Sequence, residues 1–274
     1  MIGFHDDAAT SKLLTIRDLT ISFNGGHGGE AVHGVSLEMG YGEVVGLVGE
    51  SGSGKTMTAL AIAGLIARGL TQTTGEILFE GTDLLRCSRS ELRKIQGKDI
   101  GIVFQEPMTS LNPLMRVGRQ IEEPLRIHSD LSPDRRRESA LRMMERVELP
   151  DPEHTYLKYP HQLSGGQRQR AMIAAATISN PKLLIADEPT TALDAVVQGH
   201  ILALLKLINE NRGVGILFIS HDLSVVRRLC SRVAVMHEGK IVEQGPTEEI
   251  FENPQEDYTR KLINAIPTRP RPNF

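Results

Sequence analysis

The sequence has 274 residues, a formal net charge of −3 at pH 7 and 40% hydrophobic residues. A chain of this length can bury a sizeable core, and we expect one α/β domain that carries an insertion. The slightly acidic balance argues against a general nucleic-acid binder, since such proteins usually carry a basic excess. The two cysteines, Cys87 and Cys230, lack the spacing of a metal site or a disulfide framework, which fits a reducing compartment. The N-terminus has no secretory signal pattern and no stretch approaches about 18 uninterrupted apolar residues, so we expect neither export nor a membrane span.

The first part of the chain alternates apolar and polar residues in short pieces. Residues 14–17 and 19–23 read as two β-strands of an antiparallel sheet, broken by a glycine-rich turn at 24–29. Phe23 closes the second piece, and its ring is suited either to a core or to stacking on a nucleotide base. The residues alone favour the core.

A glycine-rich octapeptide follows an apolar run at 44–48 and leads into an apolar run at 57–62. Its members are Gly49, Glu50, Ser51, Gly52, Ser53, Gly54, Lys55 and Thr56. The order strand, glycine loop, helix is the context in which this pattern cradles phosphates, with inward backbone N–H groups and the positive end of a helix dipole. We expect Lys55 to reach the β- and γ-phosphates of a nucleotide and Thr56 to ligate Mg²⁺. A glycine-rich turn that binds nothing is the alternative.

The middle of the chain changes in character at Glu106. Residues 75–81 predict an edge strand of the first sheet, 84–94 a short helix, and 100–104 a strand that ends at Gln105. Beyond it, Pro107, Pro113 and Pro124 are expected to interrupt regular structure. Helical spacing of apolar residues returns between Pro133 and Leu149, with Ser132 at the helix start, so residues 106–160 predict a small helical insertion.

Strands alternate with helices in the last part of the chain. Ser164 is positioned to cap a helix, and the strands expected at 183–186 and 215–219 are separated by a helix at about 196–209. A hairpin at 233–243 follows. This alternation predicts a mainly parallel sheet with its ligands at the carboxyl ends of the strands. The residues at those ends are Gly49, Gln105, Asp187 and His221.

The strand ends supply the groups that phosphoryl transfer requires. Asp187 closes an apolar strand and is suited to hold Mg²⁺, while Glu188 can face an attacking water as general base. His221 is placed to donate a hydrogen bond to the γ-phosphate. A solvated helix start for the two carboxylates and a structural role for the histidine are the alternatives.

A second anion cradle is predicted further along the chain. It consists of a hydroxyl, two glycines and the N-terminus of the following helix, contributed by Ser164, Gly165, Gly166 and Gln167. Because the first loop already holds the phosphates from one side, a second cradle in the same chain requires a second molecule. A head-to-tail dimer, in which each chain offers this segment to its partner's nucleotide, satisfies both loops.

Taken together, these motifs resemble the ATP-binding subunit of an ABC transporter over nearly the whole chain. The family's motifs occur in its order at 49–56, Gln105, 163–167, 183–188, 192–194 and His221. The resemblance implies ATP and Mg²⁺ as ligands and a P-loop ATPase core with a mainly parallel sheet, an antiparallel β subdomain and an inserted α-helical subdomain. It also implies that Phe23 stacks on adenine, that Gln105 lies near Mg²⁺ and the attacking water and senses the membrane subunits, and that Asp194 contacts the dimer partner.

The segments at 104–113, 159–163 and 253–260 are similar to those of peptide and nickel importers. Many subunits of this group carry a cysteine-rich C-terminal extension with an iron–sulfur cluster, but no cysteine follows Cys230, so we expect no cluster. The implied organisation is an ABC ATPase domain at 13–247, with a core at 13–105 and 161–247, a helical subdomain at 106–160, and a C-terminal extension at 248–274.

The resulting hypothesis is an ATPase that powers uptake of peptides, with nickel or a metal chelate as the alternative cargo. The expected partners are transmembrane permease subunits, a second ATPase subunit that is the same or a different chain, and an extracytoplasmic substrate-binding protein. The expected location is peripheral, on the cytoplasmic face of the inner membrane. A soluble ABC ATPase acting on DNA or ribosomes competes with this hypothesis, but the sequence shows neither heptads nor an internal repeat. A regulatory subunit that does not hydrolyse ATP is a further alternative, against which Glu188 weighs.

Overall fold

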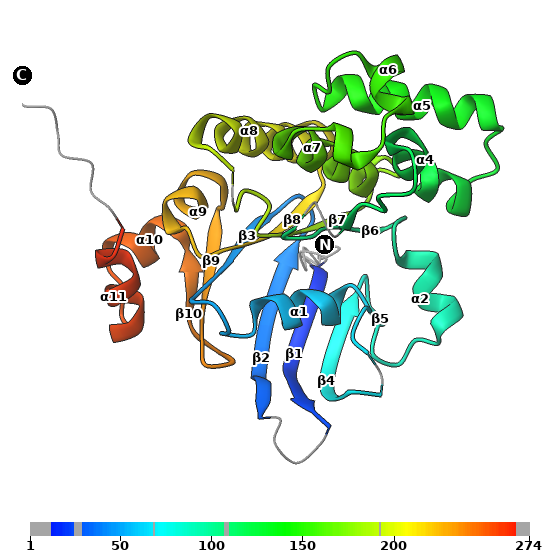
Figure 1. Ribbon diagram of the computed structural model, residues 1–274. Coiled ribbons are helices and arrows are strands. Elements are labelled where there is room, and N and C mark those ends of the chain that lie inside the picture. The colour runs from blue at the N-terminus through cyan, green and yellow to red at the C-terminus, as the bar shows by residue number, and fades with distance from the viewer. Residues whose placement is uncertain (1–11, 25–28, 68, 107–109, 192, 267–274) are drawn as a thin grey trace, which may run out of the picture.

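A four-stranded antiparallel sheet forms one part of the molecule (Figure 1). The computed structural model describes residues 12–266 except 25–28, 68, 107–109 and 192. The strand order in this sheet is β2-β1-β4-β5, with bounds β1 Lys12–Phe23, β2 Glu30–Gly40, β4 Thr71–Phe79 and β5 Thr82–Asp83.

Two details of this sheet differ from the sequence prediction. The two short pieces expected at 14–17 and 19–23 are one strand, β1, in which the pairing to β4 shifts between Arg17 and Thr20. Asp18 adopts a φ of 47° there, so a bulge absorbs the irregular residues without ending the strand. Strand β4 is also not the edge, because it pairs with β1 on one side and with the two-residue β5 on the other.

The second sheet has six strands and is mainly parallel, as predicted. Its order is β10-β9-β3-β8-β7-β6, and all neighbours pair in parallel except β10, which is antiparallel to β9. The bounds are β3 Val44–Val48, β6 Ile100–Val103, β7 Leu183–Asp187, β8 Gly215–Ser220, β9 Arg232–His237 and β10 Lys240–Pro246. Every residue of β3, β7 and β8 is buried, which explains their uninterrupted apolar runs.

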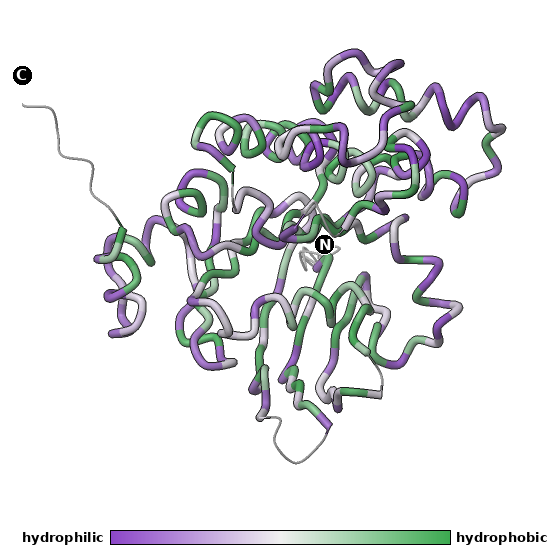
Figure 2. Tube along the Cα trace, viewed as in Figure 1, coloured by the Kyte–Doolittle hydropathy of each residue, from purple (hydrophilic) through white to green (hydrophobic). Residues whose placement is uncertain are grey.

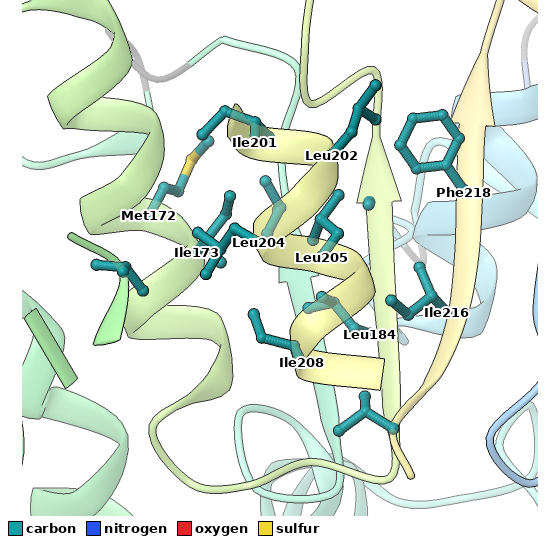
Figure 3. Close-up of a cluster of buried hydrophobic side chains, with 14 of the residues drawn as sticks. Met172, Ile173, Leu184, Ile201, Leu202, Leu204, Leu205, Ile208, Ile216 and Phe218 are labelled. Carbon is teal, nitrogen blue, oxygen red and sulfur yellow. The ribbon is translucent and has the colours of Figure 1, made fainter. Parts of the chain in front are cut away.

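Alternate residues of the six-stranded sheet feed two separate cores. Leu184, Ile216 and Phe218 face α7 (Gly165–Thr177) and α8 (Ala195–Arg212), whose side chains interdigitate with them in Figure 3. The next residues along the same strands, such as Ile185 and Leu217, belong to the core shared with α1 (Lys55–Ile62) and the antiparallel sheet. The period of two along each strand therefore places one apolar layer on each face of the sheet. In Figure 2 the strands are correspondingly hydrophobic and the outer helices are mostly hydrophilic.

The helical insertion lies beside α7, at the upper right of Figure 1, and contains α4 (Val117–His128), α5 (Pro133–Arg146) and α6 (Pro152–Leu157). Ser132 caps α5 as predicted, accepting a bond from the Arg135 N–H. The prediction that Pro124 interrupts regular structure is wrong, since it lies inside α4. The lost backbone hydrogen bond is tolerated because Val117, Gly118 and Ile121 are buried against neighbouring helices.

The remaining helices are α2 Arg89–Ile95, α9 Leu223–Leu229, α10 Thr247–Glu252 and α11 Asp257–Asn264, with a 3₁₀ turn at Pro160–Gln162. The short helix expected at 84–94 is α2, and the hairpin expected at 233–243 is β9 and β10. None of the helices within the described ranges is long and apolar enough to cross a membrane. The domain boundaries proposed from sequence remain predictions.

Candidate active site

The glycine loop at 49–56 connects β3 to α1 at the carboxyl end of the parallel sheet. Gly49, Gly52 and Gly54 have φ values of 152°, 82° and 102°. A Cβ atom on Gly49 would lie 2.1 Å from the Met236 carbonyl oxygen, and one on Gly54 would lie 2.5 Å from the Ala31 carbonyl oxygen. Positive φ and lack of space together require glycine at Gly49 and Gly54.

Lys55 lies under this loop and is only 5% exposed. Its ammonium group donates hydrogen bonds to the carbonyl oxygens of Gly49 at 2.9 Å and Glu50 at 2.8 Å. Burial lowers the pKa of Lys55, and the negative charges of Glu188 and Asp187 oppose that shift. The lysine therefore brings a partly desolvated positive charge to the loop, where an incoming phosphate gains more from it than in water.

The Thr56 hydroxyl donates a hydrogen bond of 3.3 Å to Oδ1 of Asp187. Asp187 is 3% exposed, and burial raises the pKa of its carboxyl group. Mg²⁺ in nucleotide sites is held by one or two protein oxygens, the substrate phosphates and water. A hydroxyl and a buried carboxylate that already meet beside a phosphate loop fit this ion, so the residues predicted to hold Mg²⁺ are suited to it.

The Glu188 carboxylate is where three polar side chains converge. Its Oε2 atom accepts hydrogen bonds from Gln105 Nε2 at 3.1 Å and Thr191 Oγ1 at 2.9 Å, and it lies 3.1 Å from His221 Nδ1. The backbone of Glu188 has a φ of 46°, a strained conformation of the kind found at functional sites. Sequence reasoning placed Gln105, Glu188 and His221 at strand ends, and the structure brings these three together.

Thr191 is a member of this cluster that sequence reasoning missed. It follows Glu188 by three residues, and its backbone N–H also donates to the Glu188 carbonyl oxygen at 3.2 Å. A threonine three positions after a carboxylate in a turn was the only signal available. The turn therefore fixes both the backbone and the carboxylate of Glu188.

The second cradle lies at the start of α7. Ser164 accepts a hydrogen bond from the Gln167 N–H at 3.3 Å, and the Gln167 side chain accepts one from the Ser164 N–H at 3.1 Å, so the two form a capping box. A Cβ atom on Gly166 would lie 2.7 Å from Val197 Cγ1, so this glycine lets α7 approach α8, whereas Gly165 has no such close neighbour. In the described part of the chain, no recorded hydrogen bond joins this segment to the glycine loop.

Two further residues have clear positions. Phe23 is 44% exposed at the end of β1, so the core position that the residues alone favoured is wrong. Asp194 caps α8, since its Oδ1 atom accepts hydrogen bonds from the N–H groups of Val196 at 3.1 Å and Val197 at 2.9 Å.

Within the glycine loop, Ser53 is buried while Glu50, Ser51 and Gly52 are exposed. The segment that resembles importers at 104–113 includes residues 107–109, and the motif at 192–194 includes residue 192, which lie outside the described residues.

Comparison with protein families gives two matches. The family described as "ABC transporter" matches residues 32–191, and the family described as "Oligopeptide/dipeptide transporter, C-terminal region" matches residues 242–273. The first match covers the glycine loop, Gln105, the second cradle and both carboxylates. The second covers most of β10 and all of α10 and α11, and extends past the described residues.

Similar proteins include the oligopeptide transport ATP-binding protein OppD of Bacillus subtilis. It is 48% identical over 262 residues, which are 94% of this chain and 73% of that protein. The dipeptide transport ATP-binding protein DppD of Lactococcus lactis is 45% identical over 262 residues, 95% of this chain and 75% of that protein. Among solved structures, the ATP-binding cassette MJ0796, a dimer bound to ADP and Pi, superposes with a TM-score of 0.77 at 32% identity, covering 85% of this chain and 98% of that one. The chain therefore belongs to the ABC transporter family, as an ATP-binding ATPase subunit.

Proposed function

We propose that the described site hydrolyses ATP and that this hydrolysis powers the import of peptides through membrane subunits. The observation that carries the proposal is the position of the Glu188 carboxylate, which lies one residue beyond the Thr56–Asp187 pair and between Gln105 and His221. A carboxylate held there can accept a proton from a water molecule aligned with the γ-phosphate. The regulatory alternative without hydrolysis would not require it.

The residues around the glycine loop have separate roles in binding and hydrolysing ATP. The N–H groups at 51–56 and the Lys55 ammonium hold the phosphates. The exposed ring of Phe23, at the end of β1, stacks on adenine. Thr56, Asp187 and Gln105 would hold Mg²⁺, which neutralises charge that develops on the phosphates. Glu188 accepts the proton of the water, while Gln105 and Thr191 keep its carboxylate oriented. His221 donates a hydrogen bond to the γ-phosphate with the ring nitrogen that faces away from Glu188.

The segment at 164–167 completes the site of a second copy or a related chain. Its helix N-terminus offers N–H groups to an anion, and among the described residues it makes no hydrogen bond to this chain's own glycine loop. In the proposed dimer, ATP bound by the loop of one subunit is closed over by this segment of the other, and Asp194 lies beside it as a contact across the dimer. Closing and reopening of the pair would drive the transmembrane permease subunits through the segment that begins at Gln105.

Peptides are the proposed cargo because the C-terminal family match and the named relatives point to oligopeptide and dipeptide transport. The chain then acts on the cytoplasmic face of the membrane, and an extracytoplasmic binding protein delivers the peptide. Replacing the chain by its Glu188→Gln variant in cells should abolish uptake of a labelled oligopeptide. Unchanged peptide uptake together with lost uptake of radioactive nickel would assign the metal as cargo instead.

The assignment of the base is tested with the purified chain. Glu188→Gln should bind MgATP but release phosphate at least about 100-fold more slowly, and it should accumulate as an ATP-loaded dimer in size-exclusion chromatography. Glu210→Gln is a matched control, since Glu210 is an exposed residue of α8 that forms an ion pair with Lys206. Normal turnover by Glu188→Gln would overturn the assignment.

A further inference from the structure

The hydroxyl group of Tyr258, in the last helix of the described chain, reaches the glycine loop. The backbone N–H of Glu50 donates a hydrogen bond to Tyr258 Oη at 3.1 Å, although the two residues are 208 positions apart. Figure 1 shows α11 beside α10 and the β10 edge of the six-stranded sheet. A residue of the C-terminal segment thus contacts the first turn of the loop that binds phosphate.

The ring of Tyr258 is held by the hairpin of β9 and β10. It stacks on His237, with ring centroids 3.7 Å apart and planes inclined by 23°. The Glu243 carboxylate of β10 accepts the N–H groups of Gln255 at 2.7 Å and Glu256 at 3.2 Å, which fixes the segment that leads into α11. Burial raises the pKa of Tyr258, so its hydroxyl stays protonated at neutral pH.

The same hairpin also supports the loop directly. The N–H of Gly239 donates to the Ser53 carbonyl oxygen at 3.1 Å, and the Met236 carbonyl lies where a side chain on Gly49 would be. Loop, hairpin and C-terminal helix are therefore in contact with one another at a single place. A movement of α11 would therefore displace Tyr258 and, through its hydrogen bond, the backbone of the loop at Glu50.

The peptide units on both sides of Glu50 are each held by a hydrogen bond. Its N–H donates to Tyr258 Oη, and its carbonyl oxygen accepts from the Lys55 ammonium at 2.8 Å. The position of Lys55 and the direction of the following N–H groups depend on this residue. We propose that Tyr258 is a positioning residue for the phosphate loop, through which docking of the C-terminal helix raises the affinity for ATP.

This inference rests on the proposed function, since it requires ATP at the loop. Two predictions separate it from a role in anchoring α11 alone. Loss of the hydroxyl should weaken nucleotide binding without a matching loss of stability, and because linkage is reciprocal, bound nucleotide should protect α11. An anchor alone would lower stability and leave the affinity unchanged.

The test uses the purified full chain with Tyr258→Phe, which keeps the ring and removes one hydroxyl. We expect the dissociation constant for MgATP and the KM to rise about 3- to 10-fold, as for the loss of one hydrogen bond, with kcat at saturating ATP within about 2-fold of wild type. The melting temperature without nucleotide should change by less than about 2 °C. MgATP should slow amide hydrogen exchange in 257–264 in the wild type and much less in the variant.

Tyr41→Phe is the matched control, because it also removes one tyrosine hydroxyl, which donates to Glu80 at 2.7 Å. Tyr41 precedes β3, whereas the glycine loop follows that strand, so its hydroxyl is far from the loop. Its affinity for MgATP should equal that of the wild type. Unchanged affinity in Tyr258→Phe, or an equal loss in Tyr41→Phe, overturns the inference. Lys55→Ala separates the two proposals, since MgATP binding by that variant at wild-type strength would overturn the proposed function itself.

Discussion

The hydrogen bond of 3.3 Å between Thr56 Oγ1 and Asp187 Oδ1 joins the first turn of α1 to the end of β7. It brings together two oxygen atoms, 131 residues apart in the chain, that are proposed to hold Mg²⁺. Asp187 is 3% exposed, and burial raises the pKa of its carboxyl group. A functional group placed in this way should lower the stability of the nucleotide-free chain.

The first prediction concerns Asp187→Asn. Burial raises the pKa of Asp187 above 3.8, so this carboxyl group favours the folded state only at low pH, and its contribution is lost as the pH rises through the folded-state pKa. At pH 7 the ionised, buried group is destabilising, and a neutral amide of the same shape removes that effect. We expect the variant to be more stable than wild type by about 0.5–2 kcal/mol at pH 7 and to hydrolyse ATP at least about 10-fold more slowly.

Urea unfolding of both proteins without nucleotide at pH 7 and pH 5 measures the first effect. The advantage of the variant should shrink at pH 5, because protonation of the wild-type carboxyl group becomes easier there. A variant that is less stable than wild type at pH 7 would contradict the argument.

Much of the site was readable from sequence because its signals are local. The glycine loop is continuous from 49 to 56, and the buried strand before Asp187 and Glu188 is an unbroken apolar run. Parallel strands then bring their carboxyl ends to one edge, which is why the sequence alone predicts that Gln105, Glu188 and His221 lie together.

The parts that sequence did not predict depend on contacts between distant segments or on backbone conformation. Glu188, with a φ of 46°, and Asp18, at the bulge in β1, are non-glycine residues in the left-handed region of backbone conformation. The surrounding structure imposes this conformation on them. Pro124 stays helical because tertiary packing outweighs one lost hydrogen bond. The contact of Tyr258 with Glu50 spans 208 positions and has no local pattern.

The next prediction concerns Thr191, whose hydroxyl donates to Glu188 Oε2 at 2.9 Å. Thr191→Val keeps the shape of the side chain and removes the donor, so the carboxylate loses one of the bonds that orient it. We expect kcat to fall about 3- to 10-fold while the KM for ATP changes little. Phosphate release over a range of MgATP concentrations gives both constants.

The neighbouring Thr190→Val serves as the control for Thr191→Val. Thr190 is 7% exposed, and its hydroxyl accepts from Gln198 Nε2 at 3.5 Å, while among the described residues it forms no hydrogen bond with Glu188. Its kcat should stay within about 2-fold of wild type. Equal losses in the two variants, or a rise in KM with an unchanged kcat for Thr191→Val, would argue against an orienting role.

The last prediction compares two glycines inside helices. A Cβ atom on Gly118 of α4 would lie 2.0 Å from Cδ2 of Tyr156, whose ring cannot retreat because it is buried and its hydroxyl donates to Glu122 Oε2 at 2.9 Å. Gly118→Ala should therefore lower the free energy of unfolding by about 1–3 kcal/mol. Gly199 of α8 has no atom within 4 Å of a Cβ, so Gly199→Ala should raise it by about 0.5–1 kcal/mol through helix propensity. Urea unfolding of both variants tests the prediction, because the two changes in the free energy of unfolding should have opposite signs. A Gly118→Ala protein as stable as wild type would show that α4 and α6 are not packed as described.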